Sequence, residues 1–129
     1  MILDAAHNAE GAHALAAYLK RWHPERPALV ISVMRDKDID DILTCLLPVT
    51  ADVIVTQAPS PRAMPSAELA RRVTELHASI GKSTTVIAVP DSAEAIETAF
   101  RHADTVCIAG SIFLAGAVRE GLKRRAILH

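Results

Sequence analysis

The sequence predicts an α/β fold: a Rossmann-like, doubly wound, mostly parallel sheet with helices on both faces. Short apolar runs recur along the chain without in-and-out alternation, which is typical of strands buried on both faces of a parallel sheet. Helical patterns separate these runs, and such strand–helix alternation favours right-handed β-α-β crossovers. The apolar runs are residues 2–3, 29–33, 53–55, 86–89 and 106–109.

Each predicted helix shows an apolar stripe, and local residues mark where most of these helices begin or end. Pro24 follows the first stripe and Pro48 the second, and proline cannot continue a helix. Gly81 closes the third, a common role of glycine at helix C-termini. Asp91 and Glu94 have the spacing of a capping box at the start of the fourth. The stripes are Ala12, Leu15, Leu19 and Trp22; Ile39, Ile42, Leu43, Leu46 and Leu47; Leu69, Val73, Leu76 and Ile80; Ile96, Ala99, Phe100 and Ala103; and Leu114, Val118 and Leu122.

The composition indicates one domain, residues 1–129, large enough to bury a hydrophobic core. Half of the residues are apolar, yet no run approaches the ~18 residues of a membrane span. The formal net charge of −1 gives no general attraction to nucleic acid or to an anionic membrane. No signal-peptide pattern is present, and Cys45 and Cys107 lie in apolar surroundings, which suits buried thiols of a reducing compartment. We therefore expect a cytoplasmic protein without nucleic-acid or membrane partners.

The residues that commonly bind metals or act as nucleophiles lack the required spacing. The acidic residues between positions 36 and 41 lack the glycine and the final glutamate of a calcium-binding loop. Ser111 has no nucleophile elbow around it. We predict no metal site and no catalytic nucleophile in this chain. Four histidines without metal-ligand spacing are expected on helix surfaces or ends: His13, His23, His77 and His102.

Polar residues follow four of the predicted strands, at the point where each strand ends. The carboxyl ends of parallel strands meet at one edge of the sheet, where ligands usually bind in α/β folds. Asn8 is a good helix N-cap, and the free N–H groups behind it favour an anion. Each residue also has an ordinary structural role open to it: a capped turn, a solvated charge, a pinned loop or a helix cap. The candidates are Asp4, His7 and Asn8 after the first strand, Lys37 after the second, Arg62 after the third and Ser111 after the last.

Four sequence blocks resemble one family; they occur in the family's order and are spread along the chain, so that the resemblance spans essentially all of it. LDAAHNAEGA is similar to the LDGAHNPxGA signature of folylpolyglutamate synthases and bifunctional dihydrofolate synthases, members of the Mur ligase superfamily. SVMRDKDIDDIL, VIVTQAPSPRAMPSAEL and VCIAGSIFLAGAVRE resemble the family patterns G-M-x-x-D-K-D, T-x-x-x-S-P-R-A-x-P and T-G-S-L-Y-L-x-G-E-V-R. Ala5, Ala9 and Phe113 replace the usual Gly, Pro and Tyr, and none of these changes removes a side-chain charge or amide. The resemblance is to the C-terminal domain of the family.

The resemblance implies an enzyme that uses ATP and Mg²⁺ to add L-glutamate to dihydropteroate or to a reduced folate through an acyl phosphate. The phosphate-cradling pattern G-x-x-x-x-G-K-[ST] does not occur in this sequence. In the family it belongs to an N-terminal ATPase domain, which also holds most magnesium ligands. We therefore expect that domain as the partner of this one, with the chain starting near a domain boundary. Alone, the chain is expected to be inactive.

Roles are carried over from the family position by position. Asp4 resembles the acid that reaches the nucleotide ribose, and His7 the residue that contacts the phosphate or the incoming glutamate. Asn8, Lys37 and Ser111 are placed around the glutamate. Arg62 is assigned to the same pocket or to the domain interface. No residue of this chain is expected to be catalytic in the covalent sense.

Two other functions stay open from the sequence. One is the C-terminal domain of a Mur-type cell-wall amino-acid ligase, which shares the acyl-phosphate chemistry and a similar Asp-x-x-His/Asn turn. The DKD and SPRAMP blocks favour the folate branch. The other is a free-standing, non-enzymatic module that binds a small anion in the same crevice.

Overall fold

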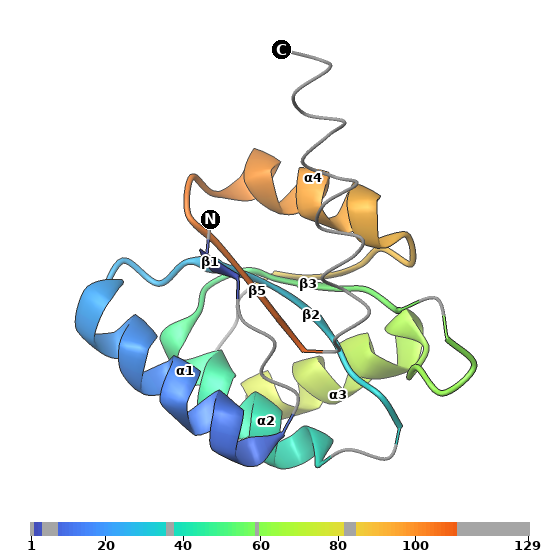
Figure 1. The fold of residues 1–129 in the computed structure, drawn as a ribbon, viewed down its shortest axis with the longest axis horizontal. Helices are drawn as coiled ribbons and strands as arrows, with labels where there is room; N and C mark the ends of the chain where they lie inside the picture. Colours follow the sequence, from blue (N-terminus) through green and yellow to red (C-terminus); the bar gives the residue numbers. More distant parts are fainter. Residues whose placement is uncertain (1, 4–7, 36–37, 59, 82–84, 111–129) are drawn as a thin grey trace.

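The computed structural model describes residues 2–3, 8–35, 38–58, 60–81 and 85–110, and within them strands and helices alternate as predicted (Figure 1). The predicted stripe at Leu114, Val118 and Leu122 lies outside the described residues. The strands are β1 (Ile2–Leu3), β2 (Ala28–Ser32), β3 (Val53–Val55), β4 (Val86–Ala88) and β5 (Val106–Gly110). The helices are α1 (Ala9–Trp22), α2 (Ile39–Leu46), α3 (Ser66–Ser79) and α4 (Ser92–His102), with a short 3-10 helix, η1 (Leu47–Val49), after α2.

The described strands form one parallel sheet of five strands in the order β1-β5-β2-β3-β4. β2 and β5 are paired along their whole length, from Ala28 beside Val106 to Ser32 beside Gly110. β5, the last described strand in the chain, therefore lies between β1 and β2. The prediction of a parallel sheet is confirmed.

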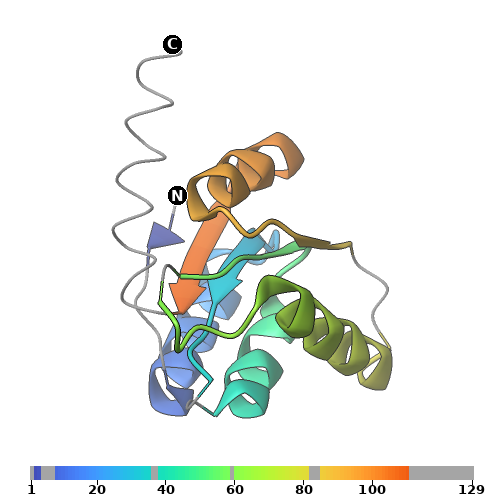
Figure 2. The same ribbon diagram turned by 90° about the vertical axis from the view of Figure 1, so that its right-hand side faces the viewer.

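Helices cover both faces of the sheet, as the doubly wound prediction requires. Among the described helices, α1, α2 and α3 pack on one face and α4 packs on the other (Figures 1 and 2). β2 contributes to both cores, because Leu29 and Ile31 join the first cluster and Val30 joins the second. Burial on both faces is the reason that this strand shows no polar alternation, and each fully buried Leu or Ile contributes about 1.5–3 kcal/mol.

β4 differs from the prediction that all the apolar runs are buried. Ala88 is exposed, and Val86 and Ile87 are only half-buried. The reason is that β4 is an edge strand of the described sheet, paired with β3 alone. The pattern of apolar residues predicted the strand, but its place at the edge depends on the strand order.

The predicted boundaries of the four described helices are confirmed: the C-terminal ends of α1, α2 and α3 and the N-terminal start of α4. The His23 N–H donates to Leu19 O at 2.8 Å just before Pro24, and Asp91 Oδ2 accepts from the Glu94 N–H at 3.0 Å. α2 ends at Leu46, and Pro48 lies within η1. Gly81 follows α3 with a φ of +73°, a left-handed conformation that glycine adopts without strain.

Several predicted burials are wrong in detail. Trp22 and Ile80, the last residues of their stripes, are 60% and 45% exposed because they lie at helix ends beyond the core. His77 was predicted on a helix surface or at a helix end; it lies in the last turn of α3 but is only 3% exposed, since it follows the buried Val73 by one helical turn. Cys107 is buried as predicted, whereas Cys45 is half-buried. In the described part of the chain, no helix has the length and apolar character needed to cross a membrane.

Candidate ligand site at the carboxyl edge

The register of the sheet brings the ends of its strands together. β2 ends at Ser32 beside Gly110, the last residue of β5, and β1 ends at Leu3 beside Ile108. The polar segments that follow these strands therefore start at one edge, as predicted. Of the candidate residues, the structure describes Asn8 and Arg62; the other four, Asp4, His7, Lys37 and Ser111, lie outside the described residues.

Asn8 is the N-cap of α1. Its backbone is extended, with φ of −144° and ψ of 172°, and its side-chain Oδ1 accepts a hydrogen bond from the Gly11 N–H at 2.8 Å. This confirms the capping role that the sequence suggested. Because α1 begins at the carboxyl edge, the positive end of its dipole faces that edge, where an anion is favoured. A direct contact between Asn8 and a ligand stays a prediction.

The loop that carries Arg62 is pinned along the segment that follows β2. The Met64 N–H donates to Val33 O, and the Arg35 N–H donates to Arg62 O, both at 2.9 Å. Met34 and Ala63 form an antiparallel bridge and share a small apolar cluster with Ala58. The Arg62 side chain is exposed on this loop. The structural role considered for the segment, a fixed loop, is therefore present, whatever further role its guanidinium has.

Gly110 lies beside Ser32 at this edge, with no room for a side chain between the two backbones. Gly110 has a φ of +112°, and a Cβ at this position would lie 1.9 Å from the Ser32 carbonyl oxygen. Only glycine fits there, both for its backbone angle and for the space. The strand end that precedes Ser111 is thus held close to β2.

Ser32 is a residue that sequence reasoning missed. Its side chain is fully buried, and among the described residues its Oγ has no hydrogen-bond partner. A buried hydroxyl without a partner costs free energy, so an unpaired one at a strand end is unusual. The available signal was a serine inside the apolar run 29–33, at the first position of the block that resembles G-M-x-x-D-K-D.

A hydrogen-bond network at the end of β3, also missed from the sequence, holds two helix starts in place. Gln57 Oε1 accepts from the Ser66 N–H at 3.1 Å and so caps α3. Thr56 Oγ1 donates to Pro90 O at 3.1 Å, and Ser92 Oγ donates to Gln57 O at 3.3 Å, which ties in the start of α4. The signal was a pair of polar residues directly after a buried strand. These groups make the edge a rigid scaffold.

The charges near this edge are largely paired with one another. The Arg35 guanidinium lies 3.2 Å from the Glu68 carboxylate, and the Arg72 guanidinium contacts Asp40, which joins α3 to α2. The pKa of Asp38 is raised, mainly by a hydrogen bond with the Asp41 carboxyl and to smaller extents by desolvation and by the charge of Asp41. No cluster of three or more potential metal ligands occurs among the described residues.

Comparisons with known proteins agree with this architecture. Residues 1–112 match the family described as "Mur ligase, glutamate ligase domain". A dihydrofolate synthase/folylpolyglutamate synthase of Mycobacterium tuberculosis (strain ATCC 25618 / H37Rv) is 38% identical over 136 residues, which cover 92% of this chain and 27% of that protein.

Solved structures show the same relationship. Mycobacterium tuberculosis folylpolyglutamate synthase complexed with ADP and AMPPCP matches with a TM-score of 0.80 and 35% identity, over 91% of this chain and 28% of that one. Folylpolyglutamate synthase from Thermotoga maritima matches with a TM-score of 0.74 and 32% identity, over 93% and 27%. The chain thus spans little more than a quarter of the length of these relatives.

Proposed function

This chain belongs to the Mur ligase, glutamate ligase domain family, and on that premise we propose that it is the C-terminal domain of a cytoplasmic, ATP-dependent ligase that adds L-glutamate to dihydropteroate or to a folate. The observation that carries the proposal is the family match over residues 1–112, together with the names of the relatives, which are dihydrofolate and folylpolyglutamate synthases. In this proposal residues 1–129 form one domain that works with an N-terminal ATPase domain of the same enzyme.

The nucleotide side of the proposed site consists of Asp4 and His7, at the crossing from β1 to α1. A carboxylate such as that of Asp4 can accept hydrogen bonds from two ribose hydroxyls. His7 would contact the phosphate or the incoming glutamate. When ATP and Mg²⁺ are bound, their chemistry is phosphorylation of the acceptor's carboxylate. By analogy with the family, most of the Mg²⁺ ligands are assigned to the N-terminal domain.

The glutamate side consists of Asn8, Lys37 and Ser111, and Arg62 is assigned either to the same pocket or to the domain interface. The α1 N-terminus behind Asn8 favours a carboxylate, and the Lys37 ammonium would offset its charge. Two described residues support this side of the site. Asn8 is fixed as the cap of α1, and Gly110, which directly precedes Ser111, is held against β2. Holding the glutamate amine in place for attack on the acyl phosphate is the task left to this domain, because positioning supplies much of the rate gain.

The Mur-type alternative differs in substrate rather than in fold. Such a ligase would use a cell-wall precursor and another amino acid on the same edge. The relatives named above favour the folate substrates. A small-anion-binding module would need no ATPase domain at all.

The test is a turnover assay on the longer protein that carries this domain. Release of phosphate from ATP should require both L-glutamate and either dihydropteroate or a folate. The 129-residue chain alone should show no such release, because it has no phosphate-binding loop. Turnover with a cell-wall precursor, but not with a folate, would establish the alternative ligase. Absence of ATP turnover with either substrate would reject the ligase proposal.

A further inference from the structure

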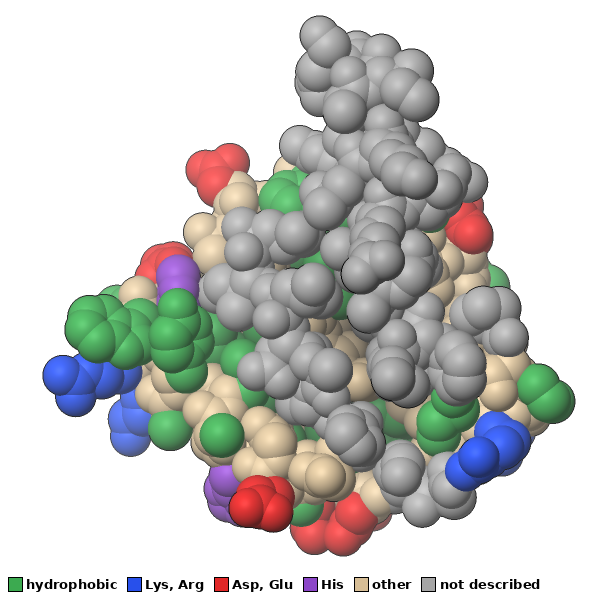
Figure 3. Space-filling view, in the orientation of Figure 1, with side chains coloured by type: hydrophobic (Ala, Val, Ile, Leu, Met, Phe, Trp, Pro, Cys, Tyr) green, Lys and Arg blue, Asp and Glu red, His purple; other side chains and the backbone are tan. Residues whose placement is uncertain are grey.

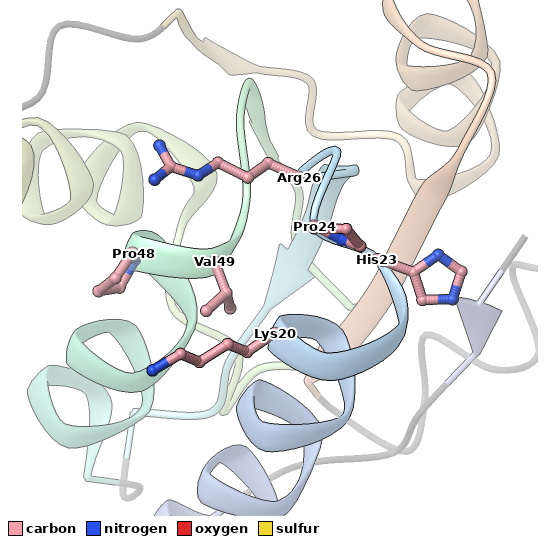
Figure 4. A pocket seen from close by; sticks show the side chains of 6 residues that line it. All are labelled: Lys20, His23, Pro24, Arg26, Pro48 and Val49. Atoms are coloured by element: carbon pink, nitrogen blue, oxygen red, sulfur yellow. The ribbon is translucent and has the colours of Figure 1, made fainter.

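A pocket lies at the amino edge of the sheet, opposite the candidate ligand site. It is formed where the chain leaves α1 and enters β2, and where η1 leads toward β3, and its volume is about 350 Å³ (Figure 4). Small-molecule sites usually range from about 300 to 1,000 Å³, so the size suits a compact ligand. The lining residues are Lys20, His23, Pro24, Arg26, Pro48 and Val49.

The pocket combines an apolar floor with two cations. Lys20 and Arg26 extend in the same direction on either side of Val49 and Pro48, while the His23 ring points away (Figure 4). The floor is firmly held, because the Ala51 N–H donates to Pro27 O at 3.0 Å and Thr50 Oγ1 donates to the Leu46 carbonyl at 2.9 Å. The cations therefore project from a fixed frame.

Neither cation has an acidic partner in the described part of the chain. The nearby carboxylate, that of Glu25, lies 2.9 Å from His23 Nδ1, and its pKa is lowered by a backbone hydrogen bond and by His23. No described acid pairs with Lys20 or Arg26. At the carboxyl edge, by contrast, Arg35 and Arg72 have acidic partners. Two cations that line one pocket without a counter-charge favour a bound anion.

The backbone of Arg26 supports the same conclusion. Its φ is +60°, a left-handed angle that non-glycine residues rarely adopt and that often marks functional positions. The Arg26 N–H donates to His23 O at 3.1 Å, which closes the turn that presents the guanidinium to the pocket. Outside the pocket, hydrophobic and basic side chains also gather on the molecular surface around the C-terminal end of α1 (Figure 3). Tyr18 and Trp22, which do not line the pocket, are 48% and 60% exposed.

We propose that this basic pocket binds a small organic anion, with its charged oxygens between Lys20 and Arg26 and its apolar body on Pro48 and Val49. The class includes carboxylates and phosphate monoesters that carry an aromatic or aliphatic group. The site is separate from the carboxyl edge and does not depend on the proposed ligase function.

The test uses amide chemical shifts of the ¹⁵N-labelled 129-residue chain during titration with phenyl phosphate and, separately, benzoate. At least one of these anions should cause saturable shifts at residues 20–26 and 48–51, with a dissociation constant near or below about 1 mM. Inorganic phosphate lacks the apolar body and benzyl alcohol lacks the charge, so each should bind roughly tenfold more weakly. If neither phenyl phosphate nor benzoate saturates the amide shifts at concentrations below about 20 mM, the proposal is overturned.

Variants separate the charge from the shape of the loop. R26G keeps the left-handed turn, because glycine adopts it freely, but removes the guanidinium; it should weaken binding about tenfold, as should K20M. R26K should retain most of the affinity. R71M is the matched control, since Arg71 is exposed on α3 and does not line the pocket. Unchanged binding by R26G, or an equal loss in R71M, would show that the pocket does not use its own cations and would refute the site.

Discussion

At the carboxyl edge of the sheet, neighbouring segments contact one another through their backbones, whereas at the amino edge the pocket is completed by side chains that reach outward. Gly110 lies against the Ser32 carbonyl, and the loop of Arg62 is hydrogen-bonded along the segment after β2. Lys20 and Arg26, at the other edge, have no acidic partner among the described residues. Substitutions at the first edge should therefore change folding and substrate use, whereas substitutions of the two pocket cations at the second should change anion binding alone.

The largest effect is expected at the carboxyl edge, and it can be measured by comparing one glycine-to-alanine substitution at each edge. Gly110→Ala places a Cβ 1.9 Å from the Ser32 carbonyl oxygen, a clash between two backbones, and should lower the free energy of unfolding by more than about 3 kcal/mol or prevent folding. Gly81→Ala, at the amino edge, meets no atom within 4 Å and has only the cost of its φ of +73°, about 1 kcal/mol. Urea unfolding followed by circular dichroism measures both.

If the two alanine variants lose stability equally, the close approach of β2 and β5 is not the constraint that the geometry implies. In that case only the positive φ, which both glycines share, would set the cost.

The next effect concerns substrate use in the longer enzyme. Lys37→Ala should raise the KM for glutamate roughly 30-fold, about 2 kcal/mol, because a carboxylate would be left without its counter-charge. Ser111→Ala should raise it less, by roughly fivefold, which corresponds to one neutral hydrogen bond.

Asp4→Ala should instead weaken the use of ATP by about 1.5–3 kcal/mol. Steady-state kinetics with glutamate and ATP varied separately give each value.

Arg71→Ala provides the control for this series, because Arg71 is exposed on α3 and has no assigned role at either edge. Small and equal changes in both KM values would return Lys37 to a solvated charge and Ser111 to a plain helix cap. They would leave the family assignment intact but remove the proposed glutamate site.

The smallest effect compares two buried hydroxyls. Thr50 Oγ1, at the amino edge, donates to Leu46 O at 2.9 Å, so Thr50→Val should cost about 1 kcal/mol of stability. Ser32 Oγ has no partner among the described residues, so Ser32→Ala should raise the free energy of unfolding by up to about 1 kcal/mol. Denaturant midpoints of the two variants are the measurement. A loss of stability in Ser32→Ala as large as in Thr50→Val would mean that the Ser32 hydroxyl is hydrogen-bonded.

The sequence predicted those features of the fold that depend on local pattern. Strand positions follow from continuous apolar runs, and helix ends follow from Pro24, Gly81 and Asp91. The shared carboxyl edge followed from the parallel sheet alone. For the candidate site, the structure confirms Asn8 as the cap of α1 and Arg62 on a fixed loop after β3, while their contacts with a ligand stay predictions.

Features that depend on contacts between distant segments could not be predicted. Gly110 has no room for a side chain because Ser32, far away in the sequence, lies beside it in the register of β2 and β5. β4 is half-exposed because of the strand order, and Trp22 is exposed because the core ends before α1 does. The basic pocket joins the end of α1 to η1, which no local motif connects.

The position of β5 determines when the sheet can be completed during synthesis. β2, β3 and β4 can pair in the order in which they are made, but among the described strands β1 has no neighbour until β5 enters between it and β2. The first strand therefore waits unpaired for more than 100 residues, until residues 106–110 have been made. Pairings over such distances close slowly and leave strand edges open to other chains in the meantime. The newly made chain should thus be most prone to aggregation just before its last described strand emerges.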